Sequence, residues 1–218
     1  TPRRPKRSAA PRAAVRAVAR ESALTVYRDA ILEAAEAEFA DRGYAATRMQ
    51  DIARRAGMSV GALYRYFDSK EAIFGSMVRR SSDRAVEQLS AAGAGAKDLS
   101  LRIGDLVESM FRFIEDHRAM FLVLRQQPEV AHAQCEAMAG QSDSGRERIL
   151  AVYREAIADG VATGELRDDV AVDDQLAFVT GAMHGFIEAW LRSGGEAGLV
   201  DKAPLITALT LRALGGAP

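Results

Sequence analysis

The segment from Thr47 to Glu71 limits the folds open to this chain more than any other stretch. Thr47 is followed by Gln50 three residues later, a capping-box pattern that predicts a short helix from Arg48 to Ala56. Gly57 then supplies a residue that tolerates positive φ, as the tight turn after such a helix requires. This pattern predicts short helices joined by a tight turn.

A second short helix is predicted from Val60 to roughly Phe67, with Ser59 as its cap. Ala53 is the small residue that lets the two helices cross closely, and the pair forms a helix-turn-helix. The apolar positions that would hold the second helix against the first are Ile52, Ala56, Met58, Leu63 and Phe67. The positions left pointing outward are Val60, Gly61, Tyr64 and Arg65. Small residues at the exposed N-terminal end of a helix permit close approach to a DNA major groove.

The rest of the chain is also predicted to be helical. Apolar residues at helical spacing predict a helix that begins near residues 23–25 and ends at Gly43, and Ser69 can cap another that starts at Lys70. A small-residue linker at 91–97 marks a candidate boundary. Beyond it we expect helices over about 99–116, 118–127, 144–162, 172–193 and 202–214.

The composition of the 218 residues is that of a globular protein, because hydrophobic residues make up 48% and charged residues 27%. The predominance of alanine, leucine, glutamate and arginine favours an all-α fold. No stretch approaches the ~20 apolar residues that a membrane-spanning helix needs. The N-terminus is basic but lacks the apolar run of a secretory signal. A single cysteine, Cys135, excludes an intramolecular disulfide framework. We therefore expect a cytoplasmic protein that makes no membrane contact.

The charge is distributed unevenly. Residues 1–80 contain 16 Lys and Arg against 9 Asp and Glu, a net +7, whereas the remainder contains 13 against 21, a net −8. Residues 1–22 are predicted to be a basic, disordered arm, because a stretch rich in arginine, proline and alanine cannot bury a core. This arm could follow a DNA backbone or serve as a solubilising tail, and the sequence leaves both open.

Several short motifs together resemble one protein family. They are Asp51-Ile-Ala, Ala56-Gly-Met-Ser, Gly61-Ala-Leu-Tyr-Arg-Tyr-Phe and Ser69-Lys-Glu. They are similar to the DNA-binding domain of the TetR family of bacterial regulators, over roughly residues 25–75. The resemblance implies a three-helix helix-turn-helix domain over 23–70 and a helical effector-binding and dimerisation domain over 71–218. It also implies that helix 71–91 connects the two.

The resemblance carries expected roles for matched positions. Those expected near bases or the adjacent backbone are Gln50, Val60, Gly61, Ala62 and Tyr64. Those expected to face phosphates are Thr47, Ser59, Tyr64, Tyr66 and Lys70. Arg65 is a further candidate, for a base or for phosphate alone. A structural role is an equal alternative for Ser59, as a cap, and for Tyr66, as a partly buried residue.

The resemblance also implies that the C-terminal part binds a small effector, expected to be apolar or aromatic, and forms a homodimer through its last two long helices. The segment 172–193 has two apolar stripes, one of them mostly glycine and alanine, so we expect helices against two of its sides. The candidate effector-binding residues are Met110, Phe111, Phe113, Ile114, Phe121, Leu124, Tyr153, Phe178, Met183 and His184. Ordinary core packing is the alternative for each of them.

Other functions have little support in the sequence. His132 and Cys135, three residues apart, are a weak hint of a metal site, and no phosphate loop or nucleophile elbow stands out. We therefore expect no metal, no cofactor and no enzymatic activity. The predicted function is a repressor released from a palindromic double-stranded DNA operator by a small-molecule effector. The alternative is a small-molecule-binding dimer that has lost specific DNA reading.

Overall fold

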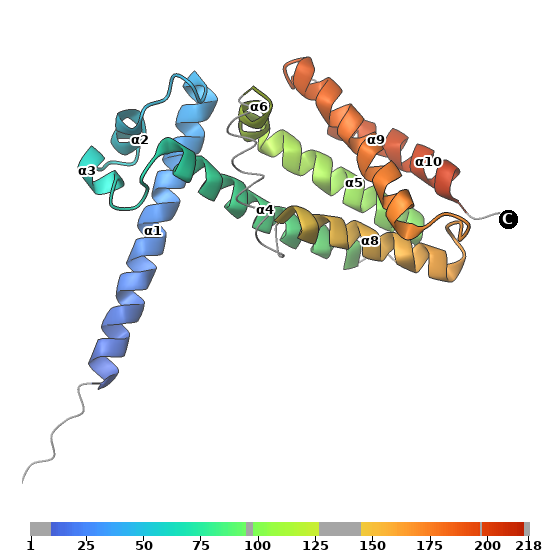
Figure 1. Ribbon diagram of the computed structural model, residues 1–218, viewed down its shortest axis with the longest axis horizontal. Coiled ribbons are helices and arrows are strands. Elements are labelled where there is room, and N and C mark those ends of the chain that lie inside the picture. The colour runs from blue at the N-terminus through green and yellow to red at the C-terminus, as the bar shows by residue number, and fades with distance from the viewer. Residues whose placement is uncertain (1–9, 95–97, 127–144, 197, 216–218) are drawn as a thin grey trace, which may run out of the picture. The chain divides into compact units, whose positions relative to one another are not determined.

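The computed structural model describes residues 10–94, 98–126, 145–196 and 198–215 (Figure 1). The elements are α1 (Ala10–Arg42), α2 (Met49–Arg55), α3 (Val60–Leu63), α4 (Lys70–Ala94), α5 (Leu99–Asp116), α6 (Arg118–Gln126), α8 (Gly145–Thr163), α9 (Val172–Arg192), the 3-10 helix η1 (Val200–Lys202) and α10 (Ala203–Leu214). Over the described ranges the β structure is limited to an isolated bridge between Leu166 and Gly215. The predicted all-α fold is confirmed.

The chain divides into two compact units after Ser76, inside α4. The small-residue segment at 91–97 falls within the second unit, and α4 continues through it as far as Ala94. Where the chain is described, no helix is long and apolar enough to cross a membrane.

In the first unit α2 packs on α1, and α3 packs on α2 (Figure 1). Its core contains Ile31, Phe39, Ile52, Leu63 and Phe74, all almost fully buried. The rings of Phe39 and Phe74 meet edge to face with centroids 6.0 Å apart. As predicted, α1 ends before Gly43, which has φ +79°. These contacts fix where α2 and α3 are held.

Helix α1 begins earlier than the sequence predicted. Its first residue is Ala10, so residues 10–22, expected to belong to a disordered arm, are helical. The prediction relied on a composition that cannot bury a core, which decides whether a segment can pack. Alanine and arginine have high intrinsic helix propensity, and this propensity favours helical backbone without such packing. Residues 1–9 of the predicted arm lie outside the described residues.

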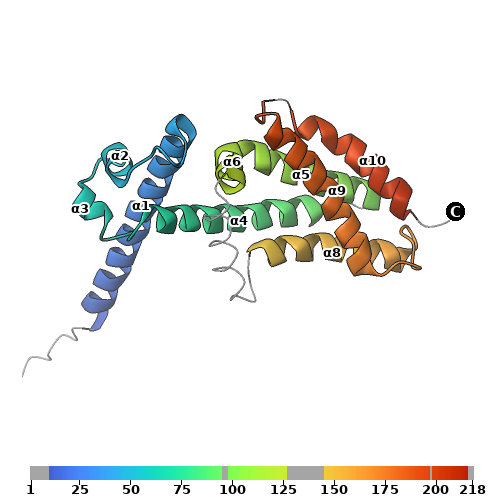
Figure 2. The same ribbon diagram turned by 45° about the horizontal axis from the view of Figure 1, so that its top comes forward.

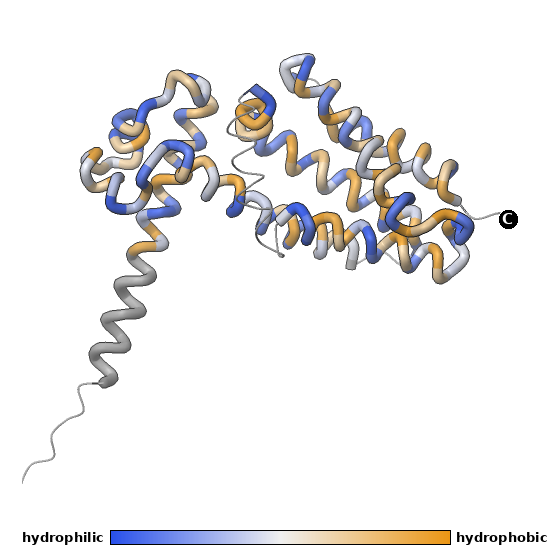
Figure 3. The backbone as a smooth tube through the Cα atoms, viewed as in Figure 1, coloured by the Kyte–Doolittle hydropathy of each residue, from blue (hydrophilic) through white to orange (hydrophobic). Residues whose placement is uncertain are grey.

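In the second unit, α5, α8, α9 and α10 form a closed ring of neighbours. Helix α5 packs on α8 and α10, and α9 also packs on α8 and α10 (Figures 1 and 2). Hydrophobic positions recur along these helices (Figure 3). The bounds predicted for α5, α6, α8, α9 and α10 agree with the structure to within one or two residues. His132 and Cys135 lie outside the described residues, within which no cluster of three metal-ligating side chains occurs.

Candidate nucleic-acid interface and effector cavity

The turn between α2 and α3 is built from local signals. Gly57 has φ +69°, and the amide of Met58 donates to the carbonyl of Ala53 at 2.9 Å, which closes the end of α2. Ser59 then accepts a hydrogen bond from the amide of Ala62 at 3.2 Å, so its predicted cap is confirmed. Regular α-helix ends at Leu63, and the amides of Arg65 and Tyr66 bond three residues back, a tighter turn that replaces the predicted helix to Phe67.

The predicted capping box of α2 is wrong. Thr47 is 1% exposed, and its hydroxyl donates to the carbonyls of Glu38 at 3.2 Å and Gly43 at 2.8 Å. The N-cap residue is Arg48, whose amide donates to the carboxylate of Asp51 at 3.2 Å. Because the Thr47 side chain is enclosed and its hydroxyl donates to two carbonyls, that side chain is not available for the expected contact with phosphate.

The face of α3 that points away from the core is open. Gly61, Tyr64 and Arg65 are exposed, Tyr64 to 49%. A Cβ added at Gly61 would meet nothing within 4 Å, so packing inside the fold does not require glycine there. Val60 and Ala62 are half-buried, whereas Gln50 and Ser59 are exposed. The structure therefore brings most of the predicted base-facing residues onto or beside one accessible surface.

Lys70 has a structural role that the sequence did not predict. Its ammonium donates to the carbonyls of Tyr44 at 2.6 Å and Thr47 at 3.0 Å and lies 4.2 Å from the centre of the Tyr44 ring. Burial lowers the pKa of Lys70, and the charge of Glu71 acts in the opposite direction. These contacts tie the start of α4 to the loop before α2, which accounts for a lysine at a helix N-terminus without any bound anion.

Tyr66 is partly enclosed, as the alternative role anticipated. It is half-buried, and its ring centre lies 5.8 Å from that of Tyr27. Its carbonyl accepts a hydrogen bond from Arg28 at 3.1 Å, and the Arg28 guanidinium lies 4.3 Å from the centre of the Phe67 ring. Tyr66 therefore helps to attach the end of the recognition segment to α1.

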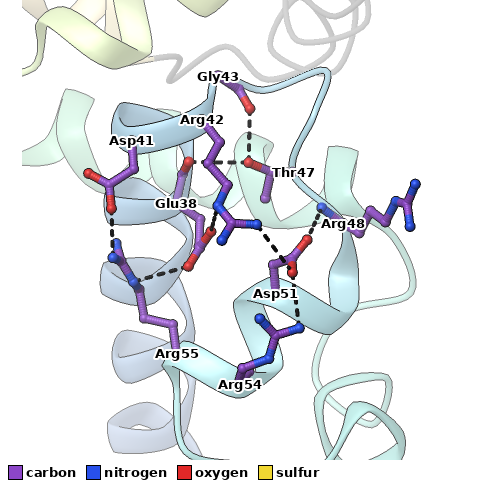
Figure 4. Close-up of polar contacts among 9 residues, drawn as sticks. All are labelled: Glu38, Asp41, Arg42, Gly43, Thr47, Arg48, Asp51, Arg54 and Arg55. Atoms are coloured by element: carbon purple, nitrogen blue, oxygen red, sulfur yellow. Dashed lines mark hydrogen bonds and ion pairs between the residues drawn. The ribbon is translucent and has the colours of Figure 1, made fainter.

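A network of ion pairs joins α1 to α2 (Figure 4). Arg55 pairs with Glu38 at 3.1 Å and with Asp41 at 2.6 Å. Asp51 pairs with Arg54 at 3.2 Å and with Arg42 at 3.6 Å, and Arg42 also reaches Glu38. The guanidinium groups of these three arginines are thus committed to carboxylates of the same unit.

Two cations between residues 24 and 76 differ from the other described cations of the first unit. Arg48 and Arg65 are exposed, and their guanidinium groups have no hydrogen-bond or ion-pair partner among the described residues. The Arg48 side chain points away from the ion-pair network in Figure 4. Arg48 was not among the predicted site residues. Its position in the sequence indicates only the start of a helix and does not show whether its side chain has an ion-pair partner.

The second unit contains a cavity of about 800 Å³ bordered by α5, α8 and α9. Four of the predicted effector-binding residues line it, namely Met110, Tyr153, Met183 and His184. Residues that the sequence did not single out complete much of its wall, namely Arg146, Ile149, Leu150, Arg154, Leu176 and Ile187.

The other predicted effector-binding residues lie elsewhere. Phe111 and Ile114 are buried in the core, and Phe113 borders a different, acidic pocket between α4 and α5. Phe121 and Leu124 are half-buried on α6, away from the walls of the cavity. Phe178 is 47% exposed on another face of α9. The cavity is therefore more aliphatic than the predicted set.

The second apolar stripe of α9 is exposed in the single chain. Gly181 and Gly185 are exposed beside Phe178, and a Cβ added at either glycine would meet nothing within 4 Å. On the neighbouring α10, Leu205 and Leu209 are 49% and 50% exposed. These residues form an apolar surface that the described part of the chain does not cover.

Comparison with known proteins places this geometry in a family. Residues 31–77 match the family model of bacterial regulatory proteins, tetR family. The transcriptional activator FasR of Mycolicibacterium smegmatis is 30% identical over 168 residues, which cover 69% of this chain and 77% of FasR. The transcriptional repressor KstR2 of Mycobacterium tuberculosis is 27% identical over 168 residues, covering 77% of this chain and 82% of KstR2.

A solved structure shares the fold. FadR from Bacillus subtilis, in complex with stearoyl-CoA, superposes with a TM-score of 0.71 at 19% identity, over 85% of this chain and 98% of FadR. With the helix-turn-helix of the first unit and these relatives, the chain is a DNA-binding transcriptional regulator and belongs to the tetR family of bacterial regulatory proteins.

Proposed function

We propose that this regulator is a homodimeric repressor that binds a palindromic operator and is released from it by a small molecule in the cavity of the second unit. The observation that carries the DNA-binding role is the open face of α3, where Gly61, Tyr64 and Arg65 are exposed and Gly61 has free space above it. Close approach of this backbone to a major groove requires that space.

The dimer is supported by the uncovered apolar surface on α9 and α10. Phe178 and two glycines are exposed on α9, and Leu205 and Leu209 are exposed on the neighbouring α10. The glycines let another helix approach closely. Two copies joined through such a surface present two recognition helices related by a twofold axis. A twofold axis in the protein matches an operator with two symmetric half-sites.

Control by an effector is supported by the cavity and by the relatives. A cavity of about 800 Å³ lies within the range typical of small-molecule sites. The related FadR structure contains stearoyl-CoA, and KstR2 is a repressor. An effector that binds better to the DNA-free arrangement of the dimer lowers operator affinity by the ratio of its two affinities.

The test begins with selection of binding sites from randomised duplex DNA by the purified full chain. We expect a palindromic site bound at least ~10³-fold more tightly than bulk DNA. Tyr64→Ala should abolish most of this preference, whereas Leu101→Ala, which truncates an exposed apolar residue of the second unit, should leave it unchanged. A preference ratio near one for the wild-type chain would instead support a small-molecule-binding dimer without specific DNA reading.

A further inference from the structure

Along α8, the residues that line the cavity of the second unit change from charged to apolar and back to charged. Arg146, Ile149, Leu150, Tyr153 and Arg154 all line it, at the spacing that places residues on one face of a helix. The two arginines lie at the ends of this row, with the apolar residues between them. At 1.5 Å per residue, the row spans roughly 12 Å.

The middle of the cavity offers little to a polar ligand. Tyr153 is fully buried, its hydroxyl donates to the carbonyl of Leu106 at 2.9 Å, and burial raises its pKa, so it stays neutral. Thr180 donates its hydroxyl to the carbonyl of Leu176 at 2.8 Å. Most of the surrounding wall is aliphatic, from Met110, Leu176, Met183 and Ile187, and His184 is a further polar residue of the lining. A ligand body in this region gains most by being apolar.

The two ends of the row differ in charge. Arg154 pairs with Asp173 at 2.9 Å, and both line the cavity, so that end is close to neutral. Arg146 is exposed and has no hydrogen-bond or ion-pair partner among the described residues. One end of an apolar trough therefore has an unpaired guanidinium, the group best shaped to hold a carboxylate through two parallel hydrogen bonds.

We propose that this cavity binds an elongated aliphatic carboxylate, with its chain along α8 and its carboxylate on Arg146. This inference rests on the proposed function in that it takes the cavity to be the effector site. Of the apolar or aromatic effector expected from the sequence it keeps the apolar alternative, because none of the phenylalanines predicted to bind an effector lines the cavity.

Isothermal titration calorimetry of the full chain, without DNA, tests the site with decanoate and decan-1-ol, which share a chain and differ in the head group. We expect decanoate to bind at least about fivefold more tightly, a modest value because Arg146 is exposed when the cavity is empty. Arg146→Gln should bring the two affinities to within about twofold. Arg148→Gln makes the same charge change on the same helix, where Arg148 pairs with Asp83 outside the cavity, and should keep the difference.

Equal affinity for the two ligands, no binding of decanoate, or a preference that survives Arg146→Gln would each overturn the carboxylate site. Loss of the preference in Arg148→Gln as well would overturn it too, because overall charge would then be the cause. Operator binding measured with and without decanoate separates the two proposals. A carboxylate that binds through Arg146 but leaves operator affinity unchanged would support the site and contradict the effector role.

Discussion

Among the first-unit residues whose side chains the structure describes, Arg48 and Arg65 carry accessible positive charge that no carboxylate holds, and of these two only Arg65 was singled out by the sequence. Arg42, Arg54 and Arg55 are held by carboxylates, and Lys70 is held by two carbonyls. An internally paired cation must lose its partner before it can neutralise a phosphate. The net charge of a segment therefore overstates the positive charge that is available to DNA phosphates.

Substitution of these arginines should distinguish unpaired from paired cations by the salt dependence of operator binding. Each phosphate contact contributes about 0.9 to the slope of log affinity against log salt. Arg65→Gln or Arg48→Gln should reduce the magnitude of that slope by about 0.9 per protomer, measured by fluorescence anisotropy on the selected operator. Arg54→Gln, the paired control, should leave it unchanged. An equal change in all three variants would contradict the division between paired and unpaired cations.

Substitutions at Gly61 should change DNA binding while leaving folding intact. Alanine is a better helix former than glycine, and the added Cβ has open space, so Gly61→Ala should leave the free energy of unfolding unchanged or raise it by no more than about 1 kcal/mol. Gly61→Leu should fold equally well but hold the DNA away, which lowers operator affinity at least about tenfold. Urea denaturation and operator titration measure the two effects. Wild-type operator affinity in Gly61→Leu would show that α3 does not approach DNA at this residue.

At the scale of elements, the corner between α5 and α6 is attached to the connection between α9 and α10. The carboxylate of Glu115 accepts hydrogen bonds from the amides of Leu199 and Val200, the latter at 3.0 Å, and Arg118 donates to the carbonyl of Gly194. Leu199 is 1% exposed, so its amide is shielded from water once Glu115 is removed. This attachment links α5, which borders the cavity, to the connection that leads into α10, which carries part of the uncovered apolar surface.

Glu115→Ala should therefore destabilise the second unit by about 1–3 kcal/mol, because it leaves a buried amide without a partner. The control is Glu108→Ala, which removes an exposed carboxylate paired with Arg112 on the same helix and should change stability by less than about 0.5 kcal/mol. Urea denaturation followed by circular dichroism measures both. Similar stabilities for the two variants would mean that Glu115 contributes no more than a surface ion pair.

At the scale of the whole molecule, the proposed assembly depends on the apolar surface of α9 and α10. Leu209→Asp should convert the dimer into monomers, because burying an unpaired carboxylate costs several kcal/mol. Leu101→Asp places the same charge at a residue that is 61% exposed on another helix and should leave the dimer intact. Sedimentation equilibrium gives the mass of each variant. A dimeric Leu209→Asp variant would place the interface elsewhere.

The sequence alone determined where most helices begin and end. Gly43, Gly57 and the caps Ser59 and Ser69 act within four residues of their own position, and the spacing of apolar residues defined α5, α8, α9 and α10. The motifs of the helix-turn-helix identified the family for the same reason, since a compact supersecondary unit concentrates its constraints in one short segment. The early start of α1 was missed because packing, not propensity, was used to judge that segment.

Tertiary structure decided which side chains remain available for partners. The Thr47 hydroxyl donates to two carbonyls, so Arg48 is the N-cap of α2 and its amide donates to Asp51. The Lys70 ammonium donates to the carbonyls of Tyr44 and Thr47, more than twenty positions away. The cavity takes its wall from three helices, so its aliphatic character and the unpaired Arg146 could not be read from any one of them. Local signals set backbone conformation because they act between neighbours in the chain, whereas pairing and burial depend on residues that only folding brings together.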